Sequence, residues 1–170
     1  VRQSLDSLAN EKRGSAMVIR LLARLSRCFT AIVYNSRRSA TQHEALGYDK
    51  SRTVLVVNGV NTVTFTPSPL ERSCVRAELG LPEEALLVGR IGRNHPMKDH
   101  ATFLDAAGLV ARELPGVHFV LAGTGVEPSD PRLARRSAQP DLSGRVHLLG
   151  ERHDLPRLTA AFDVACSSSA

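Results

Sequence analysis

The stretch Val88-Gly89-Arg90-Ile91-Gly92-Arg93-Asn94-His95-Pro96-Met97-Lys98-Asp99-His100 decides the fold of the second half of this 170-residue chain. An apolar run, Ala85 to Val88 with Ile91, is typical of a buried strand and ends in a polar turn. Beyond the turn, Asp99 or His100 begins a segment whose apolar residues recur at helical spacing: Phe103, Leu104, Ala107, Val110, Ala111 and Leu114. The stretch therefore predicts a strand, a loop and a helix.

The loop of this stretch carries two permanent cations, Arg93 and Lys98. The first N–H groups of a helix have no intrahelical partner, and the helix dipole adds positive potential, so this loop favours an anion such as phosphate or diphosphate. The alternative is a solvated loop whose cations pair with nearby carboxylates. The choice of lysine at position 98 favours a ligand. This arginine-rich chain has no other lysine after Lys50, and lysine and arginine are not interchangeable.

Around this stretch, apolar runs alternate with helical patterns. Nearly continuous apolar strands separated by helices indicate a parallel sheet covered on both faces, with right-handed crossovers. We therefore predict an α/β fold with a doubly wound, Rossmann-like parallel sheet. The predicted strands are 85–91, 117–122, 145–149 and 163–166, and the predicted helices are 70–79, 99–114, 131–138 and 154–162.

The first third of the chain has a different pattern. Residues 15–29 predict an amphipathic helix whose other face carries Arg20, Arg24 and Arg27. That helix fits two partners, an anionic membrane or the rest of its own domain. Strands are predicted at 30–34 and 53–57, with a helix near 42–46 between them. Asn58-Gly59 and the proline-containing segment up to Pro69 mark the best domain boundary.

Composition narrows the function. The net charge of +5 lies in residues 1–50, which hold nine Lys/Arg against four Asp/Glu, while residues 51–170 hold thirteen of each. The positive charge is therefore local, and the chain has only seven Phe and Tyr and no Trp on which bases could stack. Both features argue against nucleic-acid binding. Three scattered cysteines indicate a reducing compartment such as the cytoplasm. The chain begins with Val1 and ends in serines directly after an apolar run, so we expect a fragment of a longer protein.

Other candidate residues follow the predicted strands. Gly123-Thr124-Gly125 comes directly after strand 117–122, where ligands of doubly wound sheets bind, although a lone Gly-x-Gly pattern is weak. His95 and His100 flank Lys98, where they could hydrogen-bond a phosphate or only cap the loop. His153 follows strand 145–149, while His118 and His147 fall within strands. No histidines have metal-ligand spacing and no nucleophile elbow occurs, so neither a metal site nor a hydrolase triad is expected.

Several ordered motifs resemble the group-1 family of nucleotide-sugar-dependent glycosyltransferases. Asn58-Gly59-Val60-Asn61 with Phe65 and Pro67 is similar to the family's "NGVD…F.P" linker, and the segment from Arg93 to Lys98 is similar to its "GR…K" motif. Leu121 to Gly125 resembles the "lvG.G" loop. The remaining motifs resemble the "RV.flG…dlp.l…aDv" run and lie at 145–150, 154–156 and 161–164. The resemblance covers nearly the whole chain from about Ala31.

The resemblance implies a two-domain GT-B architecture truncated at both ends. Residues 1–64 would end the N-terminal, acceptor-side domain, and 65–170 would begin the C-terminal, donor-side domain. It implies a retaining transferase that moves a sugar from a nucleotide-diphospho-sugar to an acceptor in polysaccharide, glycolipid or glycoconjugate synthesis. Arg93 and Lys98 match the pair that grips the donor diphosphate, which makes them the expected catalytic residues. The residues expected to bind substrate are Gly123, Gly125, Val146 and Leu148.

The resemblance also sets limits. The cations would replace a metal ion, so no metal and no cofactor are expected. Relatives carry acidic, sugar-holding residues after the final serine run, and this chain stops before them, so we expect the 170-residue piece to be inactive by itself. A GT-B-type epimerase or phosphorylase, and a non-catalytic phospholigand-binding domain, remain alternatives. The expected location is cytoplasmic, at the inner membrane face if the 15–29 helix binds lipid.

Overall fold

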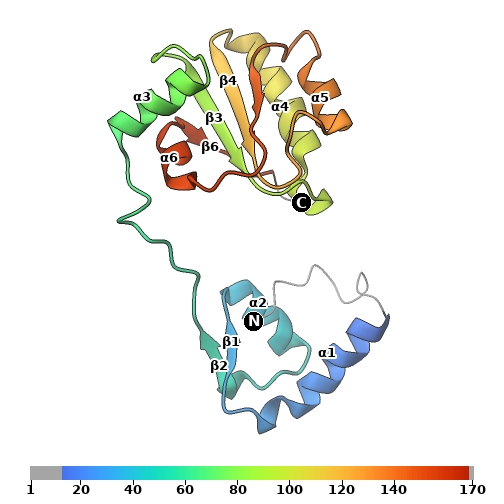
Figure 1. The fold of residues 1–170 in the computed structure, drawn as a ribbon. Coiled ribbons are helices and arrows are strands. Elements are labelled where there is room, and N and C mark those ends of the chain that lie inside the picture. Colours follow the sequence, from blue (N-terminus) through green and yellow to red (C-terminus); the bar gives the residue numbers. More distant parts are fainter. Residues whose placement is uncertain (1–12, 169–170) are drawn as a thin grey trace. The chain divides into compact units, whose positions relative to one another are not determined.

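A computed structural model of the chain describes residues 13–168. The chain separates into two compact units, residues 1–60 and 61–170, which are described one at a time (Figure 1). We call them the N-terminal unit and the C-terminal unit. Between residues 13 and 168, every helix is too short or too polar to cross a membrane.

Over residues 13–60, the N-terminal unit contains two parallel strands and two α-helices. Its elements are α1 (Arg13–Leu25), η2 (Ser26–Cys28), β1 (Ile32–Tyr34), α2 (Arg37–Ala45), η3 (Lys50–Arg52) and β2 (Thr53–Leu55). A small core joins α1 to the end of α2 through Ile19, Ala23 and Tyr48. The predicted 15–29 helix is confirmed as far as Leu25 and continues as η2, and both predicted strands are present but shorter than expected.

Helix α2 begins at Arg37, directly after Asn35-Ser36, which the sequence predicts as a helix N-cap signal, and five residues before the 42–46 helix that the apolar pattern indicates. Its first turn is polar, so apolar periodicity misses it. Ser36 sets the start instead, because its side chain accepts a hydrogen bond from the Ser39 N–H at 3.2 Å and caps the helix.

The C-terminal unit is built on a four-stranded sheet with the order β5-β4-β3-β6, and every neighbouring pair is parallel. The predicted parallel α/β fold is confirmed. Its elements are α3 (Pro69–Glu78), β3 (Leu86–Ile91), η4 (Pro96–Lys98), α4 (His100–Glu113), β4 (Val117–Ala122), α5 (Pro131–Ser137), β5 (Val146–Leu148), α6 (Leu155–Ala160) and β6 (Val164–Ala165).

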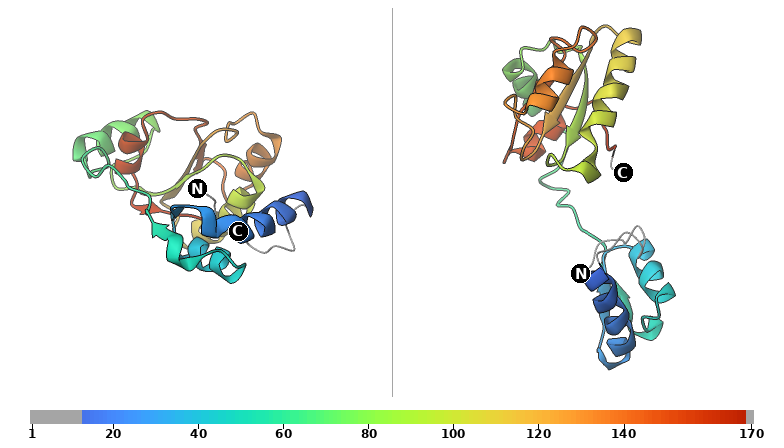
Figure 2. Two further views of the ribbon diagram at one scale, coloured as in Figure 1. Left: turned by 90° about the horizontal axis from the view of Figure 1, so that it is seen from below. Right: turned by 90° about the vertical axis from the view of Figure 1, so that its right-hand side faces the viewer.

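Helices cover both faces of this sheet (Figure 2). On one face, Phe119 and Leu121 of β4 pack with Phe103 and Leu104 of α4 and with residues of α5. On the other face, Leu87 of β3 and Val120 of β4 pack with Val75 of α3 and Leu158 of α6. Alternate residues of one strand thus enter opposite cores, which explains why the strands read as continuous apolar runs.

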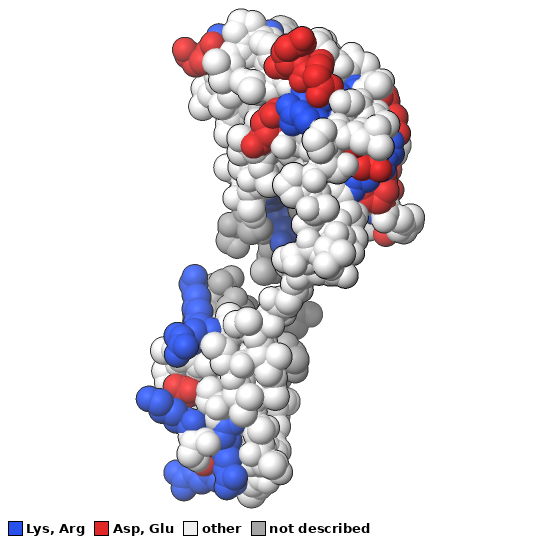
Figure 3. Space-filling model, turned by 90° about the vertical axis from the view of Figure 1, so that its left-hand side faces the viewer, with Lys and Arg blue, Asp and Glu red and all other residues white. Residues whose placement is uncertain are grey.

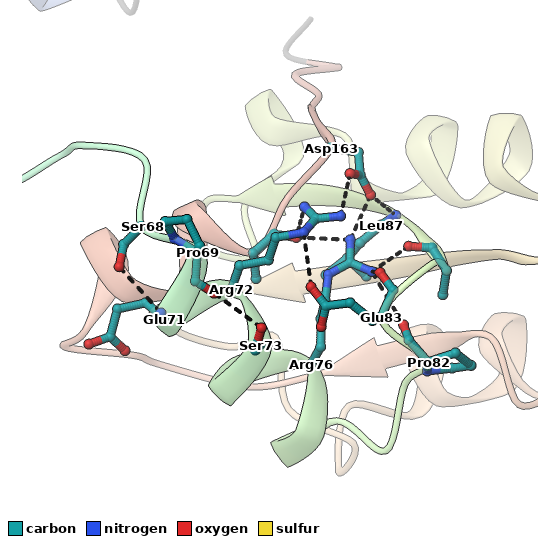
Figure 4. A network of polar contacts seen from close by, with 12 residues as sticks. Ser68, Pro69, Glu71, Arg72, Ser73, Arg76, Pro82, Glu83, Leu87 and Asp163 are labelled. Carbon is teal, nitrogen blue, oxygen red and sulfur yellow. Dashed lines mark hydrogen bonds and ion pairs between the residues drawn. The ribbon is translucent and has the colours of Figure 1, made fainter.

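A polar network fixes β6 against β3 and α3 (Figure 4). The Asp163 carboxylate accepts hydrogen bonds from Arg72 at 2.8 Å, from Arg76 at 2.7 Å and from the Leu87 N–H at 2.7 Å. Arg76 is fully buried and also donates to the Ala85 and Glu83 carbonyl oxygens. The network places the end of β6, and with it Ser168, beside the loop that follows β3.

Candidate functional site

The loop at residues 92–99 leaves the carboxyl end of β3 and is hydrogen-bonded to the loop that follows β4. The Gly92 N–H donates to the Ala122 carbonyl at 2.8 Å, and the Asn94 N–H donates to the Thr124 carbonyl at 2.8 Å. These backbone bonds extend the β3–β4 pairing beyond the ends of both strands. The loop is therefore held by the sheet itself.

Gly123 allows the two loops to approach this closely. A Cβ atom on Gly123 would lie 2.3 Å from the Gly92 carbonyl oxygen, and its φ of +147° is one that side chains rarely adopt. Its N–H donates to the Gly150 carbonyl at 2.7 Å, which brings in the segment after β5. A Cβ on Gly125 would lie 3.0 Å from the Asn94 Cβ. The ends of three strands thus meet at one edge, as predicted for ligand sites in doubly wound sheets.

The second half of the loop leads into α4 through a short 3-10 helix, η4. His95 accepts a hydrogen bond from the Met97 N–H at 3.2 Å through Nδ1. Asp99 is the N-cap of α4 and accepts from the Thr102 N–H at 3.2 Å and hydroxyl at 2.7 Å. These hydrogen bonds from Thr102 lower the pKa of Asp99. Ser168 donates to the Asp99 carbonyl at 2.8 Å, so β6 also supports the loop.

Arg93 and Lys98 are both exposed on this loop. Neither forms an ion pair with any residue in the described range 13–168. Within residues 13–168, the alternative that nearby carboxylates neutralise Arg93 and Lys98 therefore does not hold. Two uncompensated cations on a backbone-braced loop can attract a multivalent anion at low cost, because little of the loop must become ordered on binding.

His100 is not a phosphate contact, which corrects one reading of the sequence. The residue is 4% exposed, and both of its ring nitrogens are already used inside the protein. Nδ1 lies 3.1 Å from the Arg90 Nε, and Nε2 lies 3.1 Å from the carbonyl oxygens of both Gly92 and Arg93. His95 uses Nδ1 to cap η4, which matches the alternative that it only caps the loop.

Val146 and Leu148, predicted to contact substrate, lie in β5, the edge strand next to β4. Their side chains pack partly buried against the core. The Arg145 carbonyl and the Leu149 N–H form hydrogen bonds with β4. Because successive residues of a strand face opposite ways, the backbone groups of Val146 and Leu148 face the open edge. Leu148 is paired with Leu121, one residue before β4 ends. Their role in binding stays a prediction.

The other histidines lie apart from the loop. His118 and His147 face one another across β4 and β5, with 3.3 Å between the His118 Nδ1 and the His147 Nε2. His153 is exposed ahead of α6. The following Asp154 does not cap α6 with its side chain, which accepts hydrogen bonds from Arg152 and Arg157.

A hollow of about 590 Å³ lies between the first turns of α4 and α5. Asn94, His95 and Asp99 border it on the side of the loop, and Asp130, Arg132 and Arg136 border it on the side of α5. Neither Arg93 nor Lys98 lines it, so the hollow adjoins the loop without containing its two cations. Within residues 13–168, no group of three or more His, Cys, Asp or Glu is arranged to hold a metal ion.

Sequence reasoning gave no role to Arg90. The signal was present, because a charged residue sits in an otherwise apolar strand and charged side chains are rarely fully buried without a partner. Arg90 is 2% exposed, and its guanidinium carbon lies 5.7 Å from the centre of the Phe103 ring. It underlies the 92–99 loop.

Solved structures resemble this fold over nearly the whole chain. The structure of Anabaena Alr3699/HepE in complex with UDP and glucose matches 96% of this chain and 44% of its own, with a TM-score of 0.78 and 27% identity. Its complex with UDP-glucose matches 93% of this chain and 43% of its own, with a TM-score of 0.75 and 27% identity. The C-terminal unit thus matches a Rossmann-like domain of the GT-B fold.

Sequence comparison gives the same assignment. The D-inositol 3-phosphate glycosyltransferase of Mycolicibacterium gilvum is 37% identical over 129 residues, which make up 75% of this chain and 26% of that protein. The chain thus spans about a quarter of this relative and less than half of HepE. Residues 83–170 match the family described as "Glycosyl transferases group 1". Since that match covers more than half of the residues and includes the 92–99 loop, the chain belongs to the group 1 family of glycosyl transferases.

Proposed function

We propose that the protein to which this chain belongs is a retaining glycosyltransferase that moves a sugar from a nucleotide-diphospho-sugar to an acceptor. The observation that carries the proposal is the pair of exposed cations, Arg93 and Lys98, which form no ion pair within residues 13–168 and lie on a loop braced at the carboxyl edge of the sheet. Family membership and the UDP complexes of HepE support it. A surface polysaccharide, a glycolipid or a related glycoconjugate is the proposed kind of product.

In this mechanism the bond between the anomeric carbon and the diphosphate oxygen breaks, and its electron pair goes to the leaving phosphate. Negative charge therefore grows on the phosphate in the transition state. Cations already in place at Arg93 and Lys98 stabilise that charge more than they stabilise the ground state, which lowers the barrier. We propose that these two side chains supply the charge that a metal ion would otherwise provide.

The donor would lie across the ends of the strands. Gly123 and Gly125 leave room for it beside the loop, and the open backbone edge at Val146 and Leu148 offers hydrogen-bonding groups to the nucleotide base. UDP is the first nucleotide to test, because HepE was solved with UDP and with UDP-glucose. A thermal-shift comparison of UDP, GDP and ADP on the full-length protein would identify the base.

The decisive experiment measures sugar transfer by the full-length protein and by three variants. Arg93→Ala and Lys98→Ala should each lower kcat about a hundredfold, which corresponds to about 3 kcal/mol of barrier. Arg112→Ala is the matched control, because Arg112 is an exposed arginine on the last turn of α4, away from the loop. Full activity of the Lys98→Ala variant would overturn the catalytic role proposed for this pair, whereas no sugar transfer by the unmodified protein would favour a non-catalytic phospholigand-binding domain.

Product analysis separates the remaining alternatives, which use the same diphosphate site. A transferase releases nucleoside diphosphate and glycosylates an acceptor with the donor's anomeric configuration. An epimerase acts on the sugar nucleotide without an acceptor, and a phosphorylase requires inorganic phosphate. Proton NMR of the anomeric signal distinguishes retention from inversion.

The exposed face of α1 offers a further partner surface. Met17 is 69% and Leu21 is 55% exposed, Arg20 and Arg24 on the same helix are exposed, and so is Arg27 in the adjoining η2. Figure 3 shows Lys and Arg side chains on one face of the N-terminal unit. This combination fits an anionic membrane surface, at the inner face if the protein is cytoplasmic, and it equally fits packing against another part of the full-length protein. Co-sedimentation with anionic liposomes, with and without the three arginines, distinguishes membrane binding from packing within the protein.

A further inference from the structure

Arg90 is a buried cation that has no carboxylate partner among the described residues. Its side chain points from β3 toward α4, where Nε donates to the His100 Nδ1 at 3.1 Å and the guanidinium lies over the Phe103 ring. It forms no ion pair with residues 13–168, and its Nη2 is buried without a hydrogen-bond partner there. Burying such a charge costs free energy, so a purely structural role would be served better by an apolar residue.

The contact with Arg90 determines the tautomer of His100. Arginine Nε is always a donor, so the His100 Nδ1 must accept and cannot carry a hydrogen. The hydrogen of the neutral ring is then on Nε2, which donates to the carbonyl oxygens of Gly92 and Arg93, each at 3.1 Å. A doubly protonated ring would place two donors against each other at Nδ1 and Arg90 Nε. The arrangement therefore requires a neutral imidazole.

These two carbonyls belong to the turn that presents Arg93. Because they point inward to a buried ring, their negative dipoles are directed away from the exposed side of the loop. The Gly92 N–H is held at the same time by Ala122. Arg90, His100 and β4 together fix the backbone on both sides of the Gly92–Arg93 peptide.

We propose that Arg90 and His100 are positioning residues that hold the 92–99 loop in its anion-binding form, and that the loop loses affinity for a nucleoside diphosphate when His100 takes up a proton. The proposal rests on the proposed function of the same loop. It adds a proton-dependent control that Arg93 and Lys98, as permanent or strongly basic cations, do not themselves provide.

The surroundings of His100 agree with a neutral ring. Burial lowers the pKa of His100, the Arg90 cation lowers it further, and the carbonyl contacts and Asp99 oppose them without reversing the direction. The charged groups that act on the imidazole are Arg90 from β3 and Asp99 from the start of α4, whereas Arg93 meets it through its backbone carbonyl. Cys166, which follows β6, lies close enough to Arg90 to interact with its charge.

The test is UDP affinity of the full-length protein by calorimetry between pH 8 and pH 5.5. His100→Leu leaves both carbonyls and the Arg90 Nε unpaired, and it should weaken UDP binding about tenfold at pH 8. His100→Gln keeps an N–H donor for the carbonyls but cannot titrate. It should bind UDP within about threefold of the unmodified protein at pH 8, and its affinity should fall less as pH decreases. The UDP phosphate itself titrates near pH 6. The effect of His100 is therefore the difference between the pH curves of the unmodified protein and of His100→Gln.

His43→Gln is the matched control, because His43 is a second buried histidine, 1% exposed, in the N-terminal unit. It should leave UDP affinity unchanged at every pH. Equal pH curves for His100→Gln and the unmodified protein would overturn the proposal. So would unchanged UDP affinity in a folded His100→Leu variant.

A second measurement keeps the proposal testable if UDP does not bind at all, which would refute the proposed function alone. Nitrogen-15 NMR of the imidazole should show a hydrogen on Nε2 of His100 and none on Nδ1 at pH 8. Arg90→Met should remove this preference and speed hydrogen exchange at the Asn94 amide, which bonds to the Thr124 carbonyl. A hydrogen on Nδ1 of His100 instead of Nε2, or unchanged exchange of the Asn94 amide in Arg90→Met, would refute the positioning role independently of any ligand.

Discussion

Gly123 passes so close to Gly92 that a Cβ on Gly123 would lie 2.3 Å from the Gly92 carbonyl oxygen. That oxygen also accepts the hydrogen bond from His100. One carbonyl thus connects the loop after β4 with the buried His100 and Arg90 beneath the 92–99 loop. The geometry of the anion site therefore depends on a position that carries no side chain at all.

Gly123→Ala should damage both stability and binding. The new methyl group meets backbone, which cannot rotate away, and alanine disfavours the φ of +147°, so we expect a loss of about 2 kcal/mol or more of folding free energy. UDP affinity should fall in parallel, because the Gly92 carbonyl must move. Urea unfolding and calorimetry measure the two effects. Gly116→Ala, where a Cβ meets open space, is the control and should change little.

The sequence predicted the fold of the C-terminal unit because its strands are continuous apolar runs and α3, α4 and α5 have side-chain caps. Strand 117–122 was placed without error, and Asp99 was one of two residues expected to begin α4. The edge strand β6 was predicted two residues too long, because a strand paired on one side only, to β3, is defined by few backbone bonds.

The site was only partly predictable. Arg93 and Lys98 stand in an exposed loop, where charge alone suggests a ligand. The pairing of Arg90 with His100 could not be found, because periodicity does not tell which side chains from a strand and the next helix meet. The contact between His118 and His147 depends on the register of β4 with β5, which the sequence does not specify.

Asp163→Asn should destabilise the C-terminal unit by about 2 kcal/mol, because it leaves the fully buried Arg76 without a counter-charge while Asp163 itself keeps some contact with water. Burial raises the pKa of Asp163, but the hydrogen bond from the Leu87 N–H and the cations of Arg72 and Arg76 outweigh it and hold the pKa below its ordinary value. The stabilisation is therefore complete above about pH 4 and is lost as pH falls further.

Urea unfolding at pH 7 measures this loss. Asp105→Asn is the control, since Asp105 pairs with Arg136 through a side chain that is 73% exposed, and such pairs contribute about 0.5 kcal/mol or less. Equal losses in the two variants would show that the buried network around Asp163 is not stabilising.

Gly108→Ala should destabilise α4, although alanine is usually favoured over glycine in a helix by about 1 kcal/mol. A Cβ at this position would lie 2.3 Å from an Asp141 carboxylate oxygen and 2.5 Å from the Arg136 Nη2. Arg136 donates to Asp141 there at 3.0 and 3.2 Å and to the Leu104 carbonyl, so the methyl group would displace three hydrogen bonds. A higher melting temperature in this variant would contradict the packing between α4 and α5.

His118 and His147 should make stability fall between about pH 7 and pH 5. Burial lowers the pKa of His147 and the neighbouring His118 lowers it further, while burial and then Arg145 lower the pKa of His118. Each histidine thus takes up a proton more readily in the unfolded chain. Their contribution is complete above the unfolded pKa of about 6.5 and is lost as pH decreases through the folded values.

The measurement is the urea midpoint as a function of pH. Replacing both histidines with Gln should flatten the curve between pH 7 and pH 5, apart from the part due to His100. Replacing His153, which is exposed, should leave the curve unchanged. If the double variant keeps the full pH dependence, the buried pair is not its source.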